Sequence, residues 1–251
     1  MIPLQDVKQR AAKKHSDTEP WVDRWIVRKI SIHLTWLLVH TPLTANQVTL
    51  VSMALIAAGV VCLGLKIDAA PAAGAALMLL GCVFDSCDGE MARFRRATSL
   101  RGVYLDTLAH AITIPGMYLA AGIGQFIRQQ TIESLVLGAV AAVAATHPVQ
   151  VSLTVLRKGR QPEAADRPAS PAPQSGGMKS LYLKTFGRLA IFPNSMYVMS
   201  VAAAVDGVWL QGVRRGAIFW VVAFYAVLLG FEQIIAAVVW SSEERLKREV
   251  H

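Results

Sequence analysis

Long apolar runs recur along this chain and limit what it can fold into. Each run is close to the roughly 20 residues that a helix needs to cross a bilayer. The chain has 251 residues, of which 54% are hydrophobic, and its mean hydropathy of +0.42 exceeds that of an ordinary soluble domain. The sequence therefore predicts an all-α integral membrane protein.

Six transmembrane helices account for the runs. They are expected at residues 48–65, 69–84, 102–126, 134–156, 191–210 and 217–240. The first begins after a capping-box pattern, in which Thr44 and Gln47 satisfy free backbone amides. The second is expected to continue past the hydrocarbon as far as Arg93. The fifth is the weakest, because Asn194 and Asp206 interrupt it.

An amphipathic helix is predicted ahead of the spans, over residues 20–39. Its two sides differ in character: Trp21, Trp25, Ile32 and Trp36 share one, and Arg24, Arg28, Ser31 and Thr35 mark the other. Tryptophans opposite basic residues are typical of a helix lying in the headgroup region. A helix packed on a soluble partner is the alternative.

The expected organisation has three parts. Residues 1–42 hold a mobile charged tail and the interfacial helix, 43–241 form the six-helix catalytic domain, and 242–251 are a second tail. Within the domain, residues 157–188 are expected to form a flexible cytoplasmic loop rich in proline and small residues. No cleavable signal peptide is expected, because residues 1–14 contain no apolar stretch.

The basic residues predict the orientation in the membrane. The net charge is +8, and the positive residues cluster between the spans. Because cytoplasmic loops are enriched in Lys and Arg, we expect a multi-pass protein of the cell membrane with both termini cytoplasmic. Nucleic-acid binding is not expected, since no binding module accompanies the charge.

Ionisable residues gather at the ends of the second and third spans. Asp85 and Asp88 are three residues apart, and Gly102, Asp106 and His110 follow at intervals of four, so each set lies on one helix face. Charged groups at membrane depth are costly and indicate function. Two such faces turned toward each other would form an oxygen-rich site for hard divalent cations.

This spacing resembles the signature of the CDP-alcohol phosphotransferase (CDP-alcohol phosphatidyltransferase) family, D-x2-D-G-x2-A-R-x8-G-x3-D-x3-D. Seven of its eight positions match, and only the last Asp is replaced, by His110. The resemblance implies transfer of a substituted phosphate from a CDP-linked donor, such as CDP-diacylglycerol, to an acceptor alcohol. CMP would be released, in phospholipid or polar-lipid synthesis. It also implies a homodimer and contact with membrane lipid.

The resemblance also implies roles for individual residues. Asp85, Asp88 and Asp106 would hold Mg²⁺ or Mn²⁺, with two ions expected. The residues expected at the nucleotide are Asp88, Gly89, Ala92, Arg93 and Gly102. Small side chains at 89 and 92 would let the nucleotide approach the helix, and Arg93 would pair with a phosphate.

His110 departs from the family pattern. The fourth aspartate is taken to deprotonate the acceptor hydroxyl and to contribute to the second metal position, so Asp106 and His110 are the candidate catalytic residues. Histidine can act as a general base, because it titrates near neutral pH. It would remove one negative charge and one oxygen ligand. His110 is a substitute base, the mark of a subgroup with another acceptor, or the sign of lost catalysis; the retained aspartates and Arg93 argue against the last.

Two other functions remain as alternatives. A membrane prenyltransferase also uses Asp-rich motifs, but it needs two separate motifs and gives no reason for Gly89, Ala92 and Arg93. A divalent-cation transporter would need acidic residues deeper in several spans. The acceptor stays open among inositol phosphate, glycerol phosphate, serine and a lipid hydroxyl. Arg157, Arg160 and Arg188 could bind an acceptor phosphate or simply anchor the loop.

Overall fold

The computed structural model describes residues 2–11, 22–158, 194–211, 213, 215–231 and 233, and every regular element in these ranges is helical. The elements are α1 (Leu4–Ala11), a π-helical turn η1 (Asp23–Val27), α2 (Arg28–Leu38), α3 (Ala45–Gly64), α4 (Ala70–Phe94), α5 (Leu100–Gln129), α6 (Ile132–Lys158), α9 (Asn194–Val208) and a last helix, Ala217–Phe231. The all-α prediction is confirmed for this part of the chain. The loop predicted from residue 157 starts later, since α6 runs to Lys158, and the rest of it lies outside the described residues, as does the tail 242–251.

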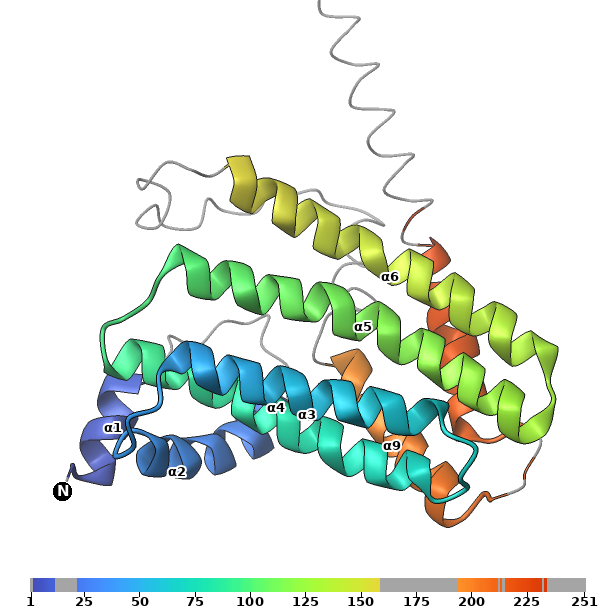
Figure 1. The fold of residues 1–251 in the computed structure, drawn as a ribbon, viewed down its shortest axis with the longest axis horizontal. Helices are drawn as coiled ribbons and strands as arrows, with labels where there is room; N and C mark the ends of the chain where they lie inside the picture. Colours follow the sequence, from blue (N-terminus) through green and yellow to red (C-terminus); the bar gives the residue numbers. More distant parts are fainter. Residues whose placement is uncertain are drawn as a thin grey trace, which may run out of the picture.

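The long helices lie side by side in a bundle (Figure 1). Helix α4 packs against α3 and α9, and α5 packs against α3 and α6. Helices α1 and α2 contact α4 near the connection from α4 to α5, at the left of Figure 1. The predicted ionisable residues occupy this end of α4 and α5.

Glycines bring neighbouring backbones into direct contact. A Cβ atom on Gly59 of α3 would lie 2.7 Å from the carbonyl oxygen of Gly74 on α4, and one on Gly74 would lie 2.7 Å from that of Gly59. Helices α5 and α6 meet in the same way, because a Cβ on Gly122 would lie 2.9 Å from the Cα of Gly138. Small residues at such contacts are the usual means by which membrane helices pack closely.

Local caps fix where the helices of the site begin. The predicted capping box is confirmed: the Gln47 amide donates to the Thr44 hydroxyl at 3.3 Å, and the Thr44 amide donates to the Gln47 side chain at 2.8 Å. Ser99 caps α5 by accepting from the Gly102 amide at 3.1 Å. Arg95 ties the end of α4 to the start of α3 by donating to the carbonyl oxygens of Thr41, at 3.0 Å, and Leu43.

The N-terminal segment differs from its prediction. Residues 4–11 are not a mobile tail but form α1, because Val7 and Ala11 are buried in a cluster with Cys87 and Met91 of α4. The amphipathic helix is present as η1 and α2, but one side is misassigned. Ser31 and Thr35 are fully buried, since both hydroxyls donate to the Glu90 carboxylate of α4, at 2.8 and 2.7 Å.

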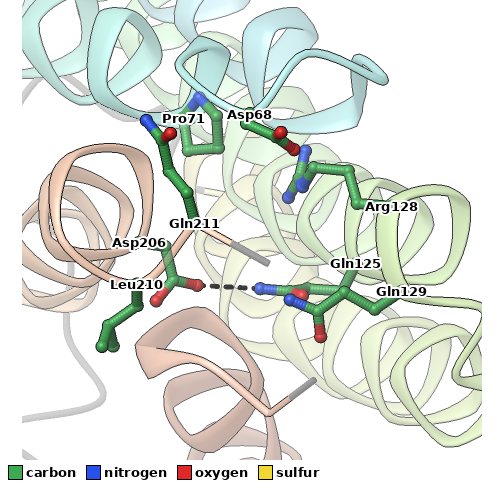
Figure 2. A pocket seen from close by; sticks show the side chains of 8 residues that line it. All are labelled: Asp68, Pro71, Gln125, Arg128, Gln129, Asp206, Leu210 and Gln211. Atoms are coloured by element: carbon green, nitrogen blue, oxygen red, sulfur yellow. Dashed lines mark hydrogen bonds between the residues drawn. The ribbon is translucent and has the colours of Figure 1, made fainter. Parts of the chain in front are cut away.

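Asp206 links three helices at the other end of the bundle (Figure 2). Its carboxylate accepts from the side chain of Gln125 on α5 at 2.8 Å and from the backbone amides of Ala217 and Ile218, at 2.5 and 3.0 Å. Asp206 therefore caps the last helix. The same contacts explain why an acidic residue interrupts an otherwise apolar segment.

Two described helices, α3 and α4, are long and apolar enough to cross a membrane. The helical stretches Ile132–Thr146 and Ala217–Phe231 are apolar but shorter. The six predicted spans are thus matched by helices in the expected places, while the number that cross the membrane stays a prediction.

Candidate active site

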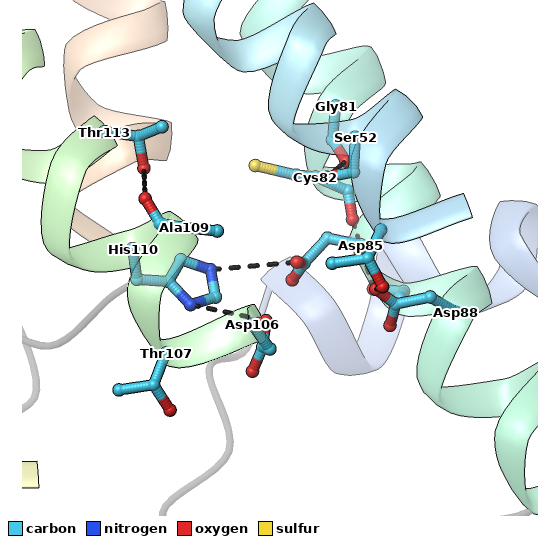
Figure 3. A network of polar contacts seen from close by, with 12 residues as sticks. Ser52, Gly81, Cys82, Asp85, Asp88, Asp106, Thr107, Ala109, His110 and Thr113 are labelled. Atoms are coloured by element: carbon cyan, nitrogen blue, oxygen red, sulfur yellow. Dashed lines mark hydrogen bonds and ion pairs between the residues drawn. The ribbon is translucent and has the colours of Figure 1, made fainter. Parts of the chain in front are cut away.

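Helices α4 and α5 bring three of the four predicted ionisable residues into one cluster (Figure 3). The His110 ring lies between two carboxylates: its Nε2 atom is 3.7 Å from Oδ1 of Asp85, and its Nδ1 atom is 3.4 Å from Oδ1 of Asp106. Asp106 precedes His110 by one turn of α5, whereas Asp85 comes from α4. The sequence spacing placed each set on one helix face, and the structure turns these two faces toward each other.

This cluster has the composition of a metal site. Asp85, Asp106 and His110 each offer one ligand atom, and the three atoms lie within 4.8 Å of one another. Their side chains are 24%, 44% and 16% exposed, so the group is partly shielded and still open to a ligand. The sequence predicted Asp88 as the third ligand, but the tightest group among the described residues contains His110 in that place.

Asp88 is held by a neighbouring helix. Its Oδ2 atom accepts a hydrogen bond of 2.5 Å from the hydroxyl of Thr49 on α3, and Thr49 is itself buried. The same hydroxyl lies 3.2 Å from the Ala45 carbonyl oxygen. One carboxylate oxygen of Asp88 is therefore engaged by protein. Asp88 still lines the same cavity as Asp85, Asp106 and His110.

Two cavities meet at this cluster. We call the first, of about 470 Å³, the acidic pocket; it is lined among others by Asp23, Asp85, Asp88, Asp106, His110 and Tyr197. We call the second, of about 210 Å³, the glycine pocket; its lining includes all five residues predicted to contact the nucleotide, Asp88, Gly89, Ala92, Arg93 and Gly102. The two pockets adjoin, because they share the lining residues Asp88, Gly89, Arg93, Val103 and Asp106.

The small residues of the signature leave room for polar neighbours. A Cβ atom on Gly89 would lie 3.2 Å from the Nη1 atom of Arg93, one turn further along α4. A Cβ atom on Gly102 would lie 3.4 Å from the side-chain oxygen of Asn46. Each glycine thus borders a side chain able to hydrogen-bond in the glycine pocket.

Sequence reasoning missed three residues that line the acidic pocket. The hydroxyl of Tyr197 on α9 donates to the Asp23 carboxylate, which lies in the interfacial segment, and Arg28 lines the pocket beside them. Asp23 and Arg28 fell within a helix assigned to the headgroup region. Nothing in the sequence joins that helix to residue 197, because the contact spans most of the chain.

Comparison with known proteins identifies the family. A sequence model of the CDP-alcohol phosphatidyltransferases matches residues 42–209. The chain belongs to the CDP-alcohol phosphatidyltransferase family. Members of this family are membrane proteins that transfer phosphoryl groups from CDP-alcohols. The membership favours this activity over the prenyltransferase and transporter alternatives.

A curated relative agrees with the assignment. The "Bifunctional IPC transferase and DIPP synthase" of Rubrobacter xylanophilus is 43% identical to this chain over 89 residues. The match covers 34% of this chain and 20% of the relative, so the matched part of the chain spans about a fifth of that protein's length. The homodimer and the cytoplasmic position of both termini stay predictions.

Proposed function

We propose that the protein transfers a substituted phosphate from a CDP-linked donor to an alcohol, in the synthesis of phospholipids or related polar lipids. The acceptor oxygen attacks the donor phosphorus distal to the cytidine. The bond from that phosphorus to the bridging oxygen breaks, CMP leaves, and a phosphodiester remains. The observation that supports this most strongly is the convergence of Asp85, Asp106 and His110 beside a pocket lined by the predicted nucleotide residues.

The residues present fit divalent metal ions. Two carboxylates and an imidazole whose ligand atoms lie within 4.8 Å of one another are a suitable donor set, and Asp88 lines the same pocket. We assign Asp85, Asp88 and Asp106 to Mg²⁺ or Mn²⁺ binding, with His110 as an added ligand candidate. A bound ion would supply positive charge against the pyrophosphate oxygens, where negative charge develops during transfer.

His110 is proposed to take the acceptor proton. The imidazole lies between the Asp85 and Asp106 carboxylates, with its nitrogen atoms 3.7 and 3.4 Å from their oxygen atoms, so the ring is placed at the centre of the acidic cluster. Asp106 also orients the ring, since it lies one turn earlier on the same helix. This arrangement gives His110 the role that the family assigns to its fourth aspartate.

The glycine pocket is proposed to hold the cytidine diphosphate. Arg93 would pair with a phosphate, because a guanidinium group donates two parallel hydrogen bonds to such oxygens. Gly89 and Ala92 leave space for the ligand at the surface of α4, because their side chains are absent or small. Gly102 leaves space in the same way on α5. In this position the pyrophosphate of the donor would lie next to Asp88 and Asp106, which line both pockets.

The test is CMP release by the purified full-length protein in detergent. CDP-diacylglycerol and other CDP-alcohols would be supplied with a panel of acceptors, with and without Mg²⁺ or Mn²⁺. We expect metal-dependent release that Asp88→Ala abolishes and that the control Asp68→Ala, at the other end of the bundle, leaves intact. Full activity in Asp88→Ala would reject the ligand assignment.

A further inference from the structure

A third cavity adjoins the acidic pocket and has a different charge. We call it the basic pocket; it has a volume of about 390 Å³ and lies between α1, α2 and α4. Its charged or titratable lining residues are Lys8, Arg28, Lys29, His33, Glu90 and Arg93. Four permanent cations therefore face one carboxylate. This excess of positive charge contrasts with the carboxylates that dominate the acidic pocket.

The carboxylate of Glu90 is already engaged. Both of its oxygens accept hydrogen bonds from α2, at 2.8 Å from Ser31 and 2.7 Å from Thr35. Glu90 is 5% exposed and serves the contact between α2 and α4. Its single negative charge offsets one of the four positive charges that line the pocket, so the net charge of the lining is positive. A pocket of this charge attracts an anion.

The packing of α1 and α2 on α4 sets where these cations lie. The Nε atom of Arg93 donates to the carbonyl oxygen of Ala11 at 2.8 Å and fixes the end of α1 against α4. Lys8 lies one turn before Ala11 and is carried to the same place. Lys29 and His33 are four residues apart on α2 and share one face. The pocket is therefore built by the packing of α1 and α2, which sequence analysis treated as a tail and a membrane-surface helix.

The basic pocket adjoins the site of transfer. Arg28, Glu90 and Arg93 line both it and the acidic pocket, and Arg93 also lines the glycine pocket. Arg93 is thus the junction of all three. Lys8, Arg28, Lys29 and His33 precede residue 42, where the family match begins, so that match does not assign them a role.

We propose that the basic pocket binds a phosphate group carried by the acceptor, so that the acceptor is a phosphorylated alcohol. The inference rests on the proposed function, in which the glycine pocket already holds the donor pyrophosphate. The phosphate of the acceptor binds to the cations of the basic pocket, beside the donor pyrophosphate. The alcohol end of the acceptor reaches the acidic pocket. An anionic lipid headgroup carries the same phosphate chemistry, and the test separates the two sources.

Binding is measured by calorimetry on the full-length protein in neutral phosphatidylcholine nanodiscs. The probes are glycerol 3-phosphate and inositol 1-phosphate, each compared with its unphosphorylated alcohol. We expect only the phosphorylated probes to bind, and we expect the double variant Lys8→Gln, Lys29→Gln to bind them about tenfold or more weakly. Arg24→Gln is the matched control, because this exposed cation of the same segment does not line the basic pocket. It should bind as the parent does, and equal binding by the double variant would overturn the proposal.

A second arm tests the lipid source. Nanodiscs containing phosphatidylglycerol should leave binding of the phosphorylated probes within a factor of about two, the change expected from surface charge alone. If the anionic lipid instead displaces the probes from the parent protein, the pocket is a lipid headgroup site and the acceptor assignment fails.

CMP release distinguishes this inference from the proposed function. Equal rates with glycerol and glycerol 3-phosphate would leave the transferase function standing and reject the phosphate pocket. Probe binding that depends on Lys8 and Lys29, without CMP release from any donor, would support the pocket and reject the transferase function.

Discussion

Gly89 and Arg93 lie in direct contact along one face of α4: a Cβ atom on Gly89 would be 3.2 Å from the Nη1 atom of Arg93. The glycine therefore lets the guanidinium group lie close against the helix at the point where the three pockets meet. The role of this glycine is to make space, since it sits in regular helix.

Gly89→Ala should displace the Arg93 guanidinium group and weaken use of the CDP-linked donor. We expect kcat/KM for the CDP-linked donor to fall about tenfold, which corresponds to one weakened charge-assisted hydrogen bond. The melting temperature should not fall, because alanine favours helix. Steady-state kinetics and a thermal melt check this. Gly230→Ala is the control, as a Cβ there meets nothing within 4 Å; a normal donor kcat/KM in Gly89→Ala would refute the argument.

Thr49→Val should leave the Asp88 carboxylate less firmly positioned and so weaken metal binding. It removes the hydroxyl that donates to Asp88 Oδ2 at 2.5 Å while keeping the side-chain volume. Outer hydrogen bonds to ligands tune metal affinity by about tenfold or more, so the Mn²⁺ concentration for half-maximal activity should rise by that factor. Thr49→Ser should restore it, and an unchanged metal requirement in Thr49→Val would show that this hydrogen bond does not support the metal site.

Substitutions of His110 should change both the turnover rate, because His110 is the proposed base, and the preferred metal. His110→Ala should lower kcat by about a hundredfold or more, the usual contribution of a general base. His110→Asp should retain activity and shift it from Mn²⁺ toward Mg²⁺, because a hard oxygen replaces a nitrogen donor. Activity ratios with the two metals check this, and normal turnover in His110→Ala would exclude the base assignment.

Asp206→Ala should affect stability without changing chemistry. The carboxylate accepts hydrogen bonds from Gln125, Ala217 and Ile218 at the end of the bundle away from the signature. Its loss leaves buried donors unsatisfied and should cost about 1–3 kcal/mol of unfolding free energy. Asp206→Asn should retain part of the lost unfolding free energy, because its side-chain oxygen still accepts hydrogen bonds. A thermal melt with activity per folded molecule checks it, and a drop in kcat at full stability would contradict a purely structural role.

The signature could be predicted from the sequence because its information is local. Intervals of three and four residues place Asp85 with Asp88 and Asp106 with His110 on helix faces, and the family pattern pairs the two faces. The capping box at Thr44 and the ends of α3 and α4 follow from equally local rules, and the structure confirms them.

Contacts between distant segments could not be predicted in this way. Ser31 and Thr35 read as the solvated side of an interfacial helix, and only the packing on α4 shows that they bind Glu90. Likewise, α1 looks like a charged tail because its buried residues are Val7 and Ala11 and the other six are polar, charged or more exposed. Asp23 meets Tyr197 from the far end of the chain. Asp23 and Tyr197 line the acidic pocket, Ala11 lines the basic pocket and Glu90 lines both, so the N-terminal part of the site becomes visible only in three dimensions.

Binding of Mn²⁺, followed by electron paramagnetic resonance on the purified protein, tests the central claim most directly. The account predicts that the parent protein binds Mn²⁺, that Asp85→Asn and Asp106→Asn weaken binding by tenfold or more, and that Asp68→Asn does not. Binding that is equally strong in all four proteins would contradict a metal site between α4 and α5.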